Sequence, residues 1–501
     1  MRKGLLQKPF VLFGDVVDKI VFTHVVVIGL PTVFYYWVLK NEGNLQALHW
    51  VMPVLYLLTS GVVIGEAIAT AVAYSAKLPR RKPKLGIIQQ ILRFRRRRPE
   101  GVLPTPVNLQ EMPRCSLVVV AYLPNEQHII LDTLKYILAT LHRPGGGLEL
   151  VLAYNTPTRL PVEDELERLA DQYPELRLVS VEGSRSKAEN LNAVIKTLKG
   201  EITGILDADH RPEPDCLERA WGWLQSGEYS VVQGRNVIRN YGSNFLTQMI
   251  AVEFECMYGV SHPAKSLLVD TGMFCGSNGY WRTSVLRRTK FQPEMMTEDI
   301  DATLRTLLRG HQLVHDPRII TTELAPVDLR SFWFQRKRWA QGWLEVALRY
   351  QMPLLRSNKL DGWQKAYWTM LLIYSAAFHF VALQIFPLLL GFSLAETEAP
   401  PISDVFFWST TLLTLMSGPF QTLTAWHLRS RSSRQSVVAY IAYCLFIPAY
   451  CVFKNMIAII AIYDHLVGNT EWVVTKRGLR EALPATMQSL SYAGKVSDRA
   501  S

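Results

Sequence analysis

Long apolar runs near both ends of the chain enclose a central region in which apolar and polar positions alternate. Residues 19–39 and 49–74 are each close to the ~20 apolar residues that a membrane-spanning helix needs, and a short polar turn joins them. Three further apolar segments follow the central region, at 366–392, 404–426 and 437–463. The pattern predicts a multi-pass membrane protein, with a transmembrane hairpin before a central domain and up to three spans after it.

The central region, from about residue 115 to residue 326, has the pattern of a soluble α/β domain. Strand-like runs at 116–123, 148–154, 176–181 and 201–209 are separated by stretches with helical periodicity. This order predicts a parallel sheet with crossover helices. Sheets of this kind hold their ligands at the carboxyl ends of the strands, so we expect the functional site there.

Two segments after the central domain differ from ordinary spans. Residues 328–350 are aromatic and basic, which predicts a helix that lies at the membrane interface. The apolar segment 437–463 contains Pro448 and Lys454, and a charge inside a bilayer is costly unless protein or a cavity surrounds it. We therefore predict that this segment is re-entrant or interfacial and returns residues 466–501 to the cytoplasm.

The charge balance agrees with a membrane location. The 501 residues carry 54 Lys and Arg against 43 Asp and Glu, a net charge of +11, and 49% of them are hydrophobic, which excludes a disordered chain. Ten of the basic residues lie between 77 and 98, directly after the second apolar run. The positive-inside rule places this run and the central domain in the cytoplasm, at the plasma (inner) membrane. Membrane lipid explains the charge, and the absence of interleaved stacking aromatics argues against a nucleic-acid partner.

The six cysteines contain no CxxC pair, and none lies in an expected external loop. This spacing argues against a disulfide framework and against a zinc site.

Three polar motifs could carry chemistry. Asp207 and Asp209 close a strand-like run, and carboxylates at i and i+2 there can hold a hard divalent cation, although the same triplet also occurs on solvated loops. Glu298 and Asp299 begin a helical run, where acids serve either as caps or as a general base. The sequence QRKRW at 335–339 is either an interfacial anchor or a group that neutralises a diphosphate and stacks on a sugar.

Together, in this order and next to membrane spans, the three motifs resemble those of the processive family 2 glycosyltransferases, the cellulose, chitin and hyaluronan synthases and their relatives. The resemblance runs from about residue 115 to residue 350. It implies a GT-A-like α/β domain inserted between transmembrane helices. The segments SKAENLNAVI (186–195) and FCGSNGYWR (274–282) add to it. FCGS is closest to cellulose-type β-glucan synthases, whereas RWAQG is also common in chitin- and poly-N-acetylglucosamine-type members, so the two hints disagree about the product.

The resemblance implies a role for each matched residue. Asp299, Glu298 and Arg338 are expected to take part in catalysis. Asp209 and Asp207 are expected to bind a Mg²⁺ or Mn²⁺ ion. Contacts to the nucleotide-sugar fall to the residues at the strand ends and on the basic helix: Ala121, Tyr122, Glu126, Asn155, Lys187, Asp207, Gln335 and Arg338. Contacts to the acceptor fall to Cys275, Gly276, Ser277 and Trp339. Trp472, Thr475 and Lys476 resemble a gating loop that closes over the nucleotide.

Two positions depart from the family pattern. The first strand ends in Ala-Tyr-Leu-Pro-Asn-Glu (121–126), a shuffled form of the usual Pro-Ala-Tyr-Asn-Glu. The second strand ends in Asn155 where the family usually has an Asp. Asn155 can still hydrogen-bond a uracil edge or a ribose hydroxyl, but it supplies no negative charge.

The sequence thus predicts a membrane-embedded inverting transferase that polymerises a UDP-sugar, with UDP-glucose as the expected donor, into a β-linked polysaccharide and extrudes it. The alternatives are a non-processive transferase that makes a glycolipid, a scaffold or receptor with an inactive transferase domain, and a transporter suggested by Glu66 and Lys454. No accessory secretion subunit can be read from the chain. The expected division is a transmembrane hairpin (1–76), a basic linker (77–114), a GT-A-like domain (115–330), an interfacial helix (331–360), membrane segments (361–465) and a tail (466–501).

Overall fold

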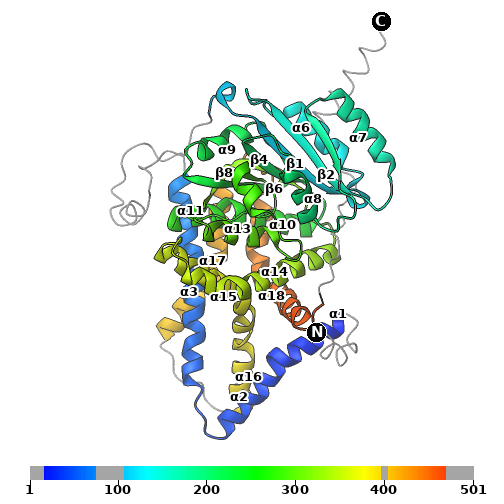
Figure 1. The fold of residues 1–501 in the computed structure, drawn as a ribbon. Helices are drawn as coiled ribbons and strands as arrows, with labels where there is room; N and C mark the ends of the chain where they lie inside the picture. The colour runs from blue at the N-terminus through cyan, green and yellow to red at the C-terminus, as the bar shows by residue number, and fades with distance from the viewer. Residues whose placement is uncertain (1–15, 75–106, 397–403, 470–501) are drawn as a thin grey trace.

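The computed structural model describes residues 16–74, 107–396 and 404–469. An α/β domain forms one end of this part of the chain, and long helices extend away from it (Figure 1). The basic run at 77–98 and the expected gating residues Trp472, Thr475 and Lys476 lie outside the described residues.

One mixed sheet organises the α/β domain. Its strand order is β3-β2-β1-β4-β7-β6-β8-β5. The strands are β1 (Cys115–Tyr122), β2 (Leu148–Asn155), β3 (Leu176–Ser180), β4 (Ile202–Asp207), β5 (Arg211–Pro212), β6 (Tyr229–Ile238), β7 (Gly279–Arg282) and β8 (Gln312–Glu323). The four strands expected from the sequence are confirmed within one or two residues at each end.

The expectation of a parallel sheet is correct for β1 to β4 and for the pair of β6 and β8, and wrong for β7 and β5. β7 is antiparallel to both of its neighbours, β4 and β6, and β5 is antiparallel to β8. The chain leaves the sheet after β6, passes through several helices and returns to insert β7 in the opposite direction. A strand of four residues that are almost all buried shows no alternation of apolar and polar positions, so periodicity could not reveal it.

Helices cover both faces of the sheet, and side chains of β1 alternate between them. Leu117 and Val119 pack with α6 (Ile130–Thr140), α7 (Pro161–Gln172) and α9 (Cys216–Leu224). Val118 and Val120 pack on the other face with α8 (Lys187–Ile195), α12 (Thr283–Thr289) and α13 (Glu298–Leu308). Burial on both faces explains why the strand-like runs are almost continuously apolar.

Within the described residues, four helical segments are long and apolar enough to cross a membrane: 17–40, 50–74, 362–395 and 437–466. They correspond to α1 (Val16–His24) with η1 (Val25–Gly29) and α2 (Leu30–Lys40), to α3 (Gln46–Tyr74), to α15 (Gly362–Leu383) with α16 (Ile385–Ala395), and to α18 (Val437–Leu466). The expected span at 404–426 forms α17 (Asp404–His427), which packs along α3 but is not among the four candidates.

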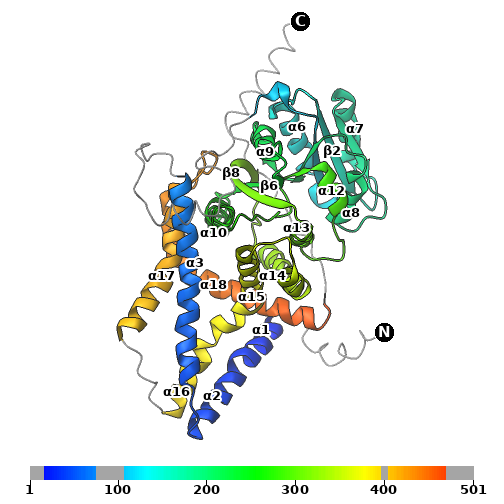
Figure 2. The same cartoon turned by 60° about the vertical axis from the view of Figure 1, so that its left-hand side comes forward.

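A layer of helices lies between the sheet and the long helices (Figures 1 and 2). It consists of α10 (Phe245–Cys256), η3 (Met257–Ser261), α11 (His262–Val269) and α14 (Leu329–Arg356). Helix α14 covers the segment that the sequence predicted to lie at the membrane interface.

Both ends of α18 contact elements on the side of the α/β domain. Before its first turn, Ser432 donates to Glu213 at 2.5 Å, and Arg235 of β6 donates to the carbonyl of Leu428 at 3.0 Å. After its last turn, Gln341 of α14 donates to the carbonyl of Asn469 at 3.1 Å. The chain just before α18 therefore lies against the α/β domain and the chain just after it lies against α14, the arrangement expected of a re-entrant or interfacial segment. Its position relative to a bilayer stays a prediction.

The two charges that suggested a transporter are held by protein groups. Glu66 of α3 accepts a hydrogen bond from Ser261 at 2.5 Å, and Lys454 of α18 donates to Glu253 of α10 at 2.6 Å. Both contacts tie a long helix to the layer beneath the sheet, which gives these residues a structural role.

Candidate functional site

The carboxyl ends of three neighbouring strands bring polar side chains to one edge of the sheet. Tyr122 ends β1, Asn155 ends β2 and Asp207 ends β4. In the register of the sheet Tyr122 lies beside Asn155, and Asp207 lies beside Val120. The predicted location of the site at this edge therefore matches the topology.

The end of β1 turns back on itself in the short helix α5 (Leu123–Glu126). The backbone N–H of Tyr122 donates to Glu126 at 2.7 Å, so the carboxylate of Glu126 closes the turn. Ala121 is buried and its carbonyl accepts from Asn190, while the Tyr122 side chain is 36% exposed. Of the expected nucleotide-contacting residues on this strand, Tyr122 offers the most accessible side chain.

Asn155 is engaged at both ends of its amide. Its Oδ1 accepts from Asn190 of α8 at 2.7 Å, and its Nδ2 donates to the carbonyl of Ser184 at 2.9 Å. An Asp at this position could accept from Asn190 but could not donate to Ser184. The Asn thus closes a neutral hydrogen-bond chain and leaves this part of the edge without a negative charge.

Lys187 links three of the predicted site segments. It begins α8, where the preceding Ser186 accepts a capping hydrogen bond from the N–H of Glu189. Its ammonium contacts the carboxylate of Asp207 and donates to the carbonyl of Gly276 at 2.8 Å. Burial alone would lower the pKa of Lys187, but Asp207 and Glu298 outweigh it and raise the pKa, so the ammonium stays charged.

The group Asp207, Asp209 and His210 has its ligand atoms within 4.8 Å of one another. Both nitrogens of His210 already face other groups: Nδ1 lies 3.1 Å from Asp209, and Nε2 lies 2.9 Å from Ser277 and 3.1 Å from Glu323. The two carboxylates are the oxygen donors that Mg²⁺ and Mn²⁺ prefer, and a carboxylate with two hydrogen bonds still has lone pairs available. Asp207 and Asp209 therefore fit such an ion, and His210 orients Asp209.

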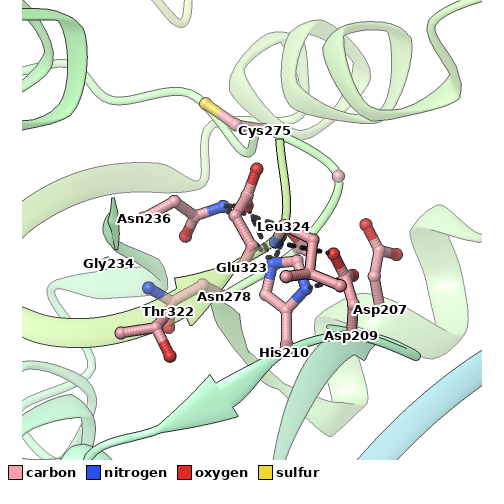
Figure 3. A network of polar contacts seen from close by, with 12 residues as sticks. Asp207, Asp209, His210, Gly234, Asn236, Cys275, Asn278, Thr322, Glu323 and Leu324 are labelled. Atoms are coloured by element: carbon pink, nitrogen blue, oxygen red, sulfur yellow. Dashed lines mark hydrogen bonds and ion pairs between the residues drawn. The ribbon is translucent and has the colours of Figure 1, made fainter. Parts of the chain in front are cut away.

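The surroundings of His210 were not identified from the sequence (Figure 3). Asn236 of β6 donates to Glu323 of β8 at 2.6 Å, and the N–H of Leu324 donates to Asp209 at 2.9 Å. Burial lowers the pKa of His210, but hydrogen bonds to Asp209 and Glu323 outweigh it and raise the pKa to about 9. The charged imidazole thus joins the end of β4 to β6, β8 and the loop that contains Ser277.

The segment 275–277 places its three residues in different surroundings. Gly276 has φ +86°, and a Cβ there would lie 3.1 Å from Oδ2 of Asp299. Only glycine adopts this backbone without strain and lets the loop approach Asp299 so closely. Ser277 contacts His210, whereas the sulfur of Cys275 points away from Asp207 and Asp209 (Figure 3).

Asp299 lies in the first turn of α13 and is half-buried. Its Oδ1 accepts from the N–H of Ile300 at 2.9 Å. Burial and the charge of Glu298 raise the pKa of Asp299 to about 7, because the hydrogen bond from Ile300 and the charges of Lys187 and Arg338 only partly offset them. A carboxylate with a pKa near neutrality can both take up and release a proton at physiological pH.

Helix α14 docks directly on the residues that precede α13. A Cβ on Gly342 would lie 2.4 Å from the side chain of Thr297, so the glycine permits this close contact. Gln335, Arg338 and Trp339 have the i, i+3, i+4 spacing that puts them on one face of the helix. Arg338 donates to the carbonyl of Met296 at 3.2 Å.

The two central residues of the QRKRW motif, Arg336 and Lys337, form ion pairs with neighbouring helices. Arg336 donates to Glu253 at 2.5 Å, and Lys337 donates to Asp464 of α18 at 2.5 Å. The guanidinium of Arg336 also lies 4.2 Å from the centre of the Trp339 ring. Among the described residues, Oε1 of Gln335 is buried and has no hydrogen-bond partner. The motif therefore combines anchoring groups with an unsatisfied acceptor.

The structure thus gathers most of the predicted site residues. Lys187, Asp207, Gly276 and Asp299 form one cluster through the contacts given above, with Glu298 and Arg338 close enough to influence the charge of Asp299. Asp209 and Ser277 join it through His210. Cys275 points elsewhere.

A sheet of this order with an acidic group at the carboxyl edge defines a GT-A-like α/β domain. Residues 202–453, roughly half of the chain, match the family model described as "Glycosyl transferase family group 2". The chain belongs to this family.

Individual relatives are distant. Poly-beta-1,6-N-acetyl-D-glucosamine synthase of Staphylococcus epidermidis is 26% identical over 254 residues, which covers 50% of this chain and 60% of that protein. Beta-monoglucosyldiacylglycerol synthase of Synechocystis is 28% identical over 292 residues, which covers 54% and 58%. The match thus spans less than two thirds of either relative.

A solved structure with a related chain path is the mannosyltransferase PcManGT from Pyrobaculum calidifontis in complex with GDP-Man and Mn²⁺. It is 20% identical, with 80% of this chain and 95% of that chain covered and a TM-score of 0.47.

Proposed function

We propose that this protein is a membrane-embedded inverting glycosyltransferase. It transfers a hexose from a UDP-sugar, with UDP-glucose as the expected donor, to the end of a β-linked polysaccharide and extrudes the product across the plasma membrane. The observation that carries the proposal is the cluster of Lys187, Asp207, Gly276 and Asp299, which joins the expected donor, metal, acceptor and base segments at one edge of the sheet.

The donor would bind across the carboxyl ends of β1, β2 and β4. Asp207 and Asp209 would hold a Mg²⁺ or Mn²⁺ ion, which when bound neutralises the charge of the diphosphate. Lys187 already contacts Asp207 and carries a positive charge that the diphosphate can share. Gln335 offers its buried, unpaired Oε1 to a donor group of the nucleotide or sugar.

The acceptor hydroxyl would attack the anomeric carbon from the side of Asp299. A new bond forms between the acceptor oxygen and the anomeric carbon, the bond from that carbon to the diphosphate oxygen breaks, and Asp299 takes up the hydroxyl proton. Arg338 stabilises the departing diphosphate, and Glu298 tunes Asp299 through its charge. Trp339 provides a ring for the terminal sugar of the acceptor, with Arg336 near the ring.

The membrane part would pass the product outward. Helix α14 bears Trp339 and connects directly to α15 and α16, one of the candidate spans. Positive-inside charge would place the α/β domain in the cytoplasm. Asn469, the last described residue, contacts Gln341 of α14, while the gating role of Trp472, Thr475 and Lys476 concerns residues outside the described part of the chain and stays a prediction.

A second candidate is a non-processive transferase that makes a membrane glycolipid. The similarity to beta-monoglucosyldiacylglycerol synthase, whose name gives a glycolipid as its product, favours it. The two candidates share the donor site and differ in whether the product remains bound for another transfer.

The decisive experiment uses the full chain in nanodiscs with UDP-glucose, UDP-N-acetylglucosamine or GDP-mannose and with Mg²⁺ or Mn²⁺. We expect nucleotide release with a UDP-sugar and a polymer that a linkage-specific hydrolase degrades, and neither with Asp299→Asn. A lipid-soluble product with a single sugar would replace the first candidate by the second. Preference for GDP-mannose would overturn the UDP assignment, and no nucleotide release with any donor would reject both candidates.

A further inference from the structure

A second group of metal-binding side chains lies beneath the sheet edge and is not used by the mechanism above. His262, Cys275 and His315 each offer one ligand atom, and these atoms all lie within 4.8 Å of one another. The sulfur of Cys275 lies 3.8 Å from Nδ1 of His262, and the two imidazole rings have centres 4.8 Å apart. Both histidines are buried, and Cys275 is half-buried.

Three separate segments of the fold supply these side chains. His262 begins α11, His315 lies within β8, and Cys275 lies in the loop that leads to β7. Helix α11 packs against β8, and the N–H of His315 donates to Ser266 of α11 at 2.9 Å. The N–H of Cys275 donates to Gln233 of β6 at 2.9 Å. Regular elements and their hydrogen bonds therefore hold all three positions, which favours a preformed site.

The separations suit a tetrahedral zinc ion. Zn–S and Zn–N bonds of ~2.3 and ~2.0–2.1 Å imply a sulfur–nitrogen separation of about 3.6 Å and a nitrogen–nitrogen separation of about 3.3 Å. The 3.8 Å between Cys275 and His262 is close to the first value, and the other pairs of ligand atoms lie within 4.8 Å, so the side chains would draw together around the ion. A thiolate with two imidazoles is a donor set that favours Zn²⁺ over the harder Mg²⁺.

The protonation states of the two histidines agree with this geometry, whereas burial and the charge of Asp299 raise the pKa of the Cys275 thiol, so the ion has to displace the thiol proton. Burial and the charge of Lys265 hold the pKa of both His262 and His315 well below the usual range, so both imidazoles are neutral and can donate a lone pair. The ammonium of Lys265 is itself directed to Ser261, whose carbonyl it contacts at 3.2 Å, and lies 3.8 Å from Glu66. Nearby negative charge thus offsets part of the repulsion that Lys265 exerts on a cation.

We propose that His262, Cys275 and His315 form a zinc site, distinct from the Asp207 and Asp209 group. On binding, the Cys275 thiol loses its proton to solvent and the thiolate bonds to Zn²⁺, leaving a fourth position for water or another exchangeable ligand. The ion would tie α11 and β8 to the loop that carries Gly276 and Ser277. The site does not depend on the proposed sugar transfer.

Cobalt is the probe, because Co²⁺ bound to a thiolate gives a near-ultraviolet charge-transfer band that carboxylate ligands do not give. The full chain in detergent is stripped with a chelator, checked for a single folded species by gel filtration, and titrated with Co²⁺ and then with Zn²⁺. We expect a thiolate band that Zn²⁺ abolishes. The band should be lost in Cys275→Ser, His262→Gln and His315→Gln, and retained in Asp209→Asn and in Cys216→Ser. No band in the unsubstituted chain, or a band that both histidine variants keep, would overturn the proposal.

A second measurement needs no substitution and so does not depend on variants that fold. Zn²⁺ should protect Cys275 from alkylation, followed by peptide mass spectrometry, because the bound ion occupies the sulfur lone pair with which the residue attacks the reagent. Cys451 is exposed and serves as the internal control, since its rate should not change. An unchanged rate at Cys275 would contradict the site.

Discussion

Two regions of this protein contain buried or half-buried acidic side chains, and the two regions shift the pKa of these acids in opposite directions. In the layer beneath the sheet, Glu253 accepts from Arg336, Tyr450 and Lys454. Burial would raise the pKa of Glu253, but the two cations outweigh it and lower the pKa to about 2. At the sheet edge, burial and the charge of the neighbouring Glu298 raise the pKa of Asp299 to about 7.

This difference in pKa distinguishes an acid that anchors helices from an acid that can react. A buried carboxylate surrounded by cations stays charged at all ordinary pH values, so its role is to hold α10, α14 and α18 together. A carboxylate that lies near another acid, and whose charge is only partly balanced by cations, can exchange a proton near neutral pH. Carboxylates of this kind are common at functional sites. Four substitutions test this distinction, in order of decreasing expected effect.

The largest effect is expected for Asp299→Asn. The amide cannot accept the acceptor proton, so turnover should fall by about 10²- to 10⁴-fold while the fold is kept. Nucleotide release measures the rate, and gel filtration checks the fold. The control is Asp132→Asn on the exposed face of α6. Retention of more than a tenth of the activity would place the proton acceptor elsewhere.

Glu253→Ala tests the anchoring region. It leaves Arg336 and Lys454 buried or half-buried without their shared partner, and losing one member of a buried ion pair costs about 3–5 kcal/mol. We expect a lower midpoint of thermal unfolding in detergent, while Glu165→Ala, an exposed acid on α7, should leave it unchanged. Since the pKa of Glu253 is lowered, its stabilising effect is present above the ordinary range of a Glu and is lost as the pH falls toward 2. Equal midpoints in the two variants would remove the anchoring role.

Gly342→Ala connects the two regions. The added methyl group would lie 2.4 Å from the side chain of Thr297 and push α14 away from the residues that carry Asp299. Overpacking of this kind costs about 1–3 kcal/mol, and turnover should fall with stability. Gly61→Ala is the matched control, because a Cβ there meets nothing within 4 Å. If both variants keep the same turnover and the same midpoint of unfolding, the close contact between Gly342 and Thr297 has no effect on the site.

The smallest effect is a shift of the pH profile in Glu298→Gln. Removing this negative charge lowers the pKa of Asp299 below about 7, so the ionised base persists to lower pH and the acidic limb of the profile moves down, by about one unit or less. Profiles are compared after scaling to their maxima, with Glu294→Gln, an exposed acid nearby, as the control. A shift toward higher pH would contradict the proposed influence of Glu298 on Asp299.

The sequence by itself determined much of this protein. Apolar length located the candidate spans, continuous apolar runs located β1 to β4, and the spacing of acidic and basic motifs led to the family. These properties are local: each depends on residues that are neighbours along the chain. The same reasoning placed Asp207, Asp209 and Asn155 at strand ends because strand ends are visible in the pattern.

Only the tertiary structure decided which of these residues meet and what else joins them. The reversed strand β7, the hydrogen bonds that link His210 to Asn236 and Glu323, and the pairing of Lys337 with Asp464 all join residues far apart in the chain. Cysteine spacing reveals only metal ligands that are close in sequence, whereas the proposed zinc ligands His262, Cys275 and His315 come from three separate segments. The pKa values of Asp299 and Glu253 likewise follow from burial and the identity of neighbours, which folding alone sets.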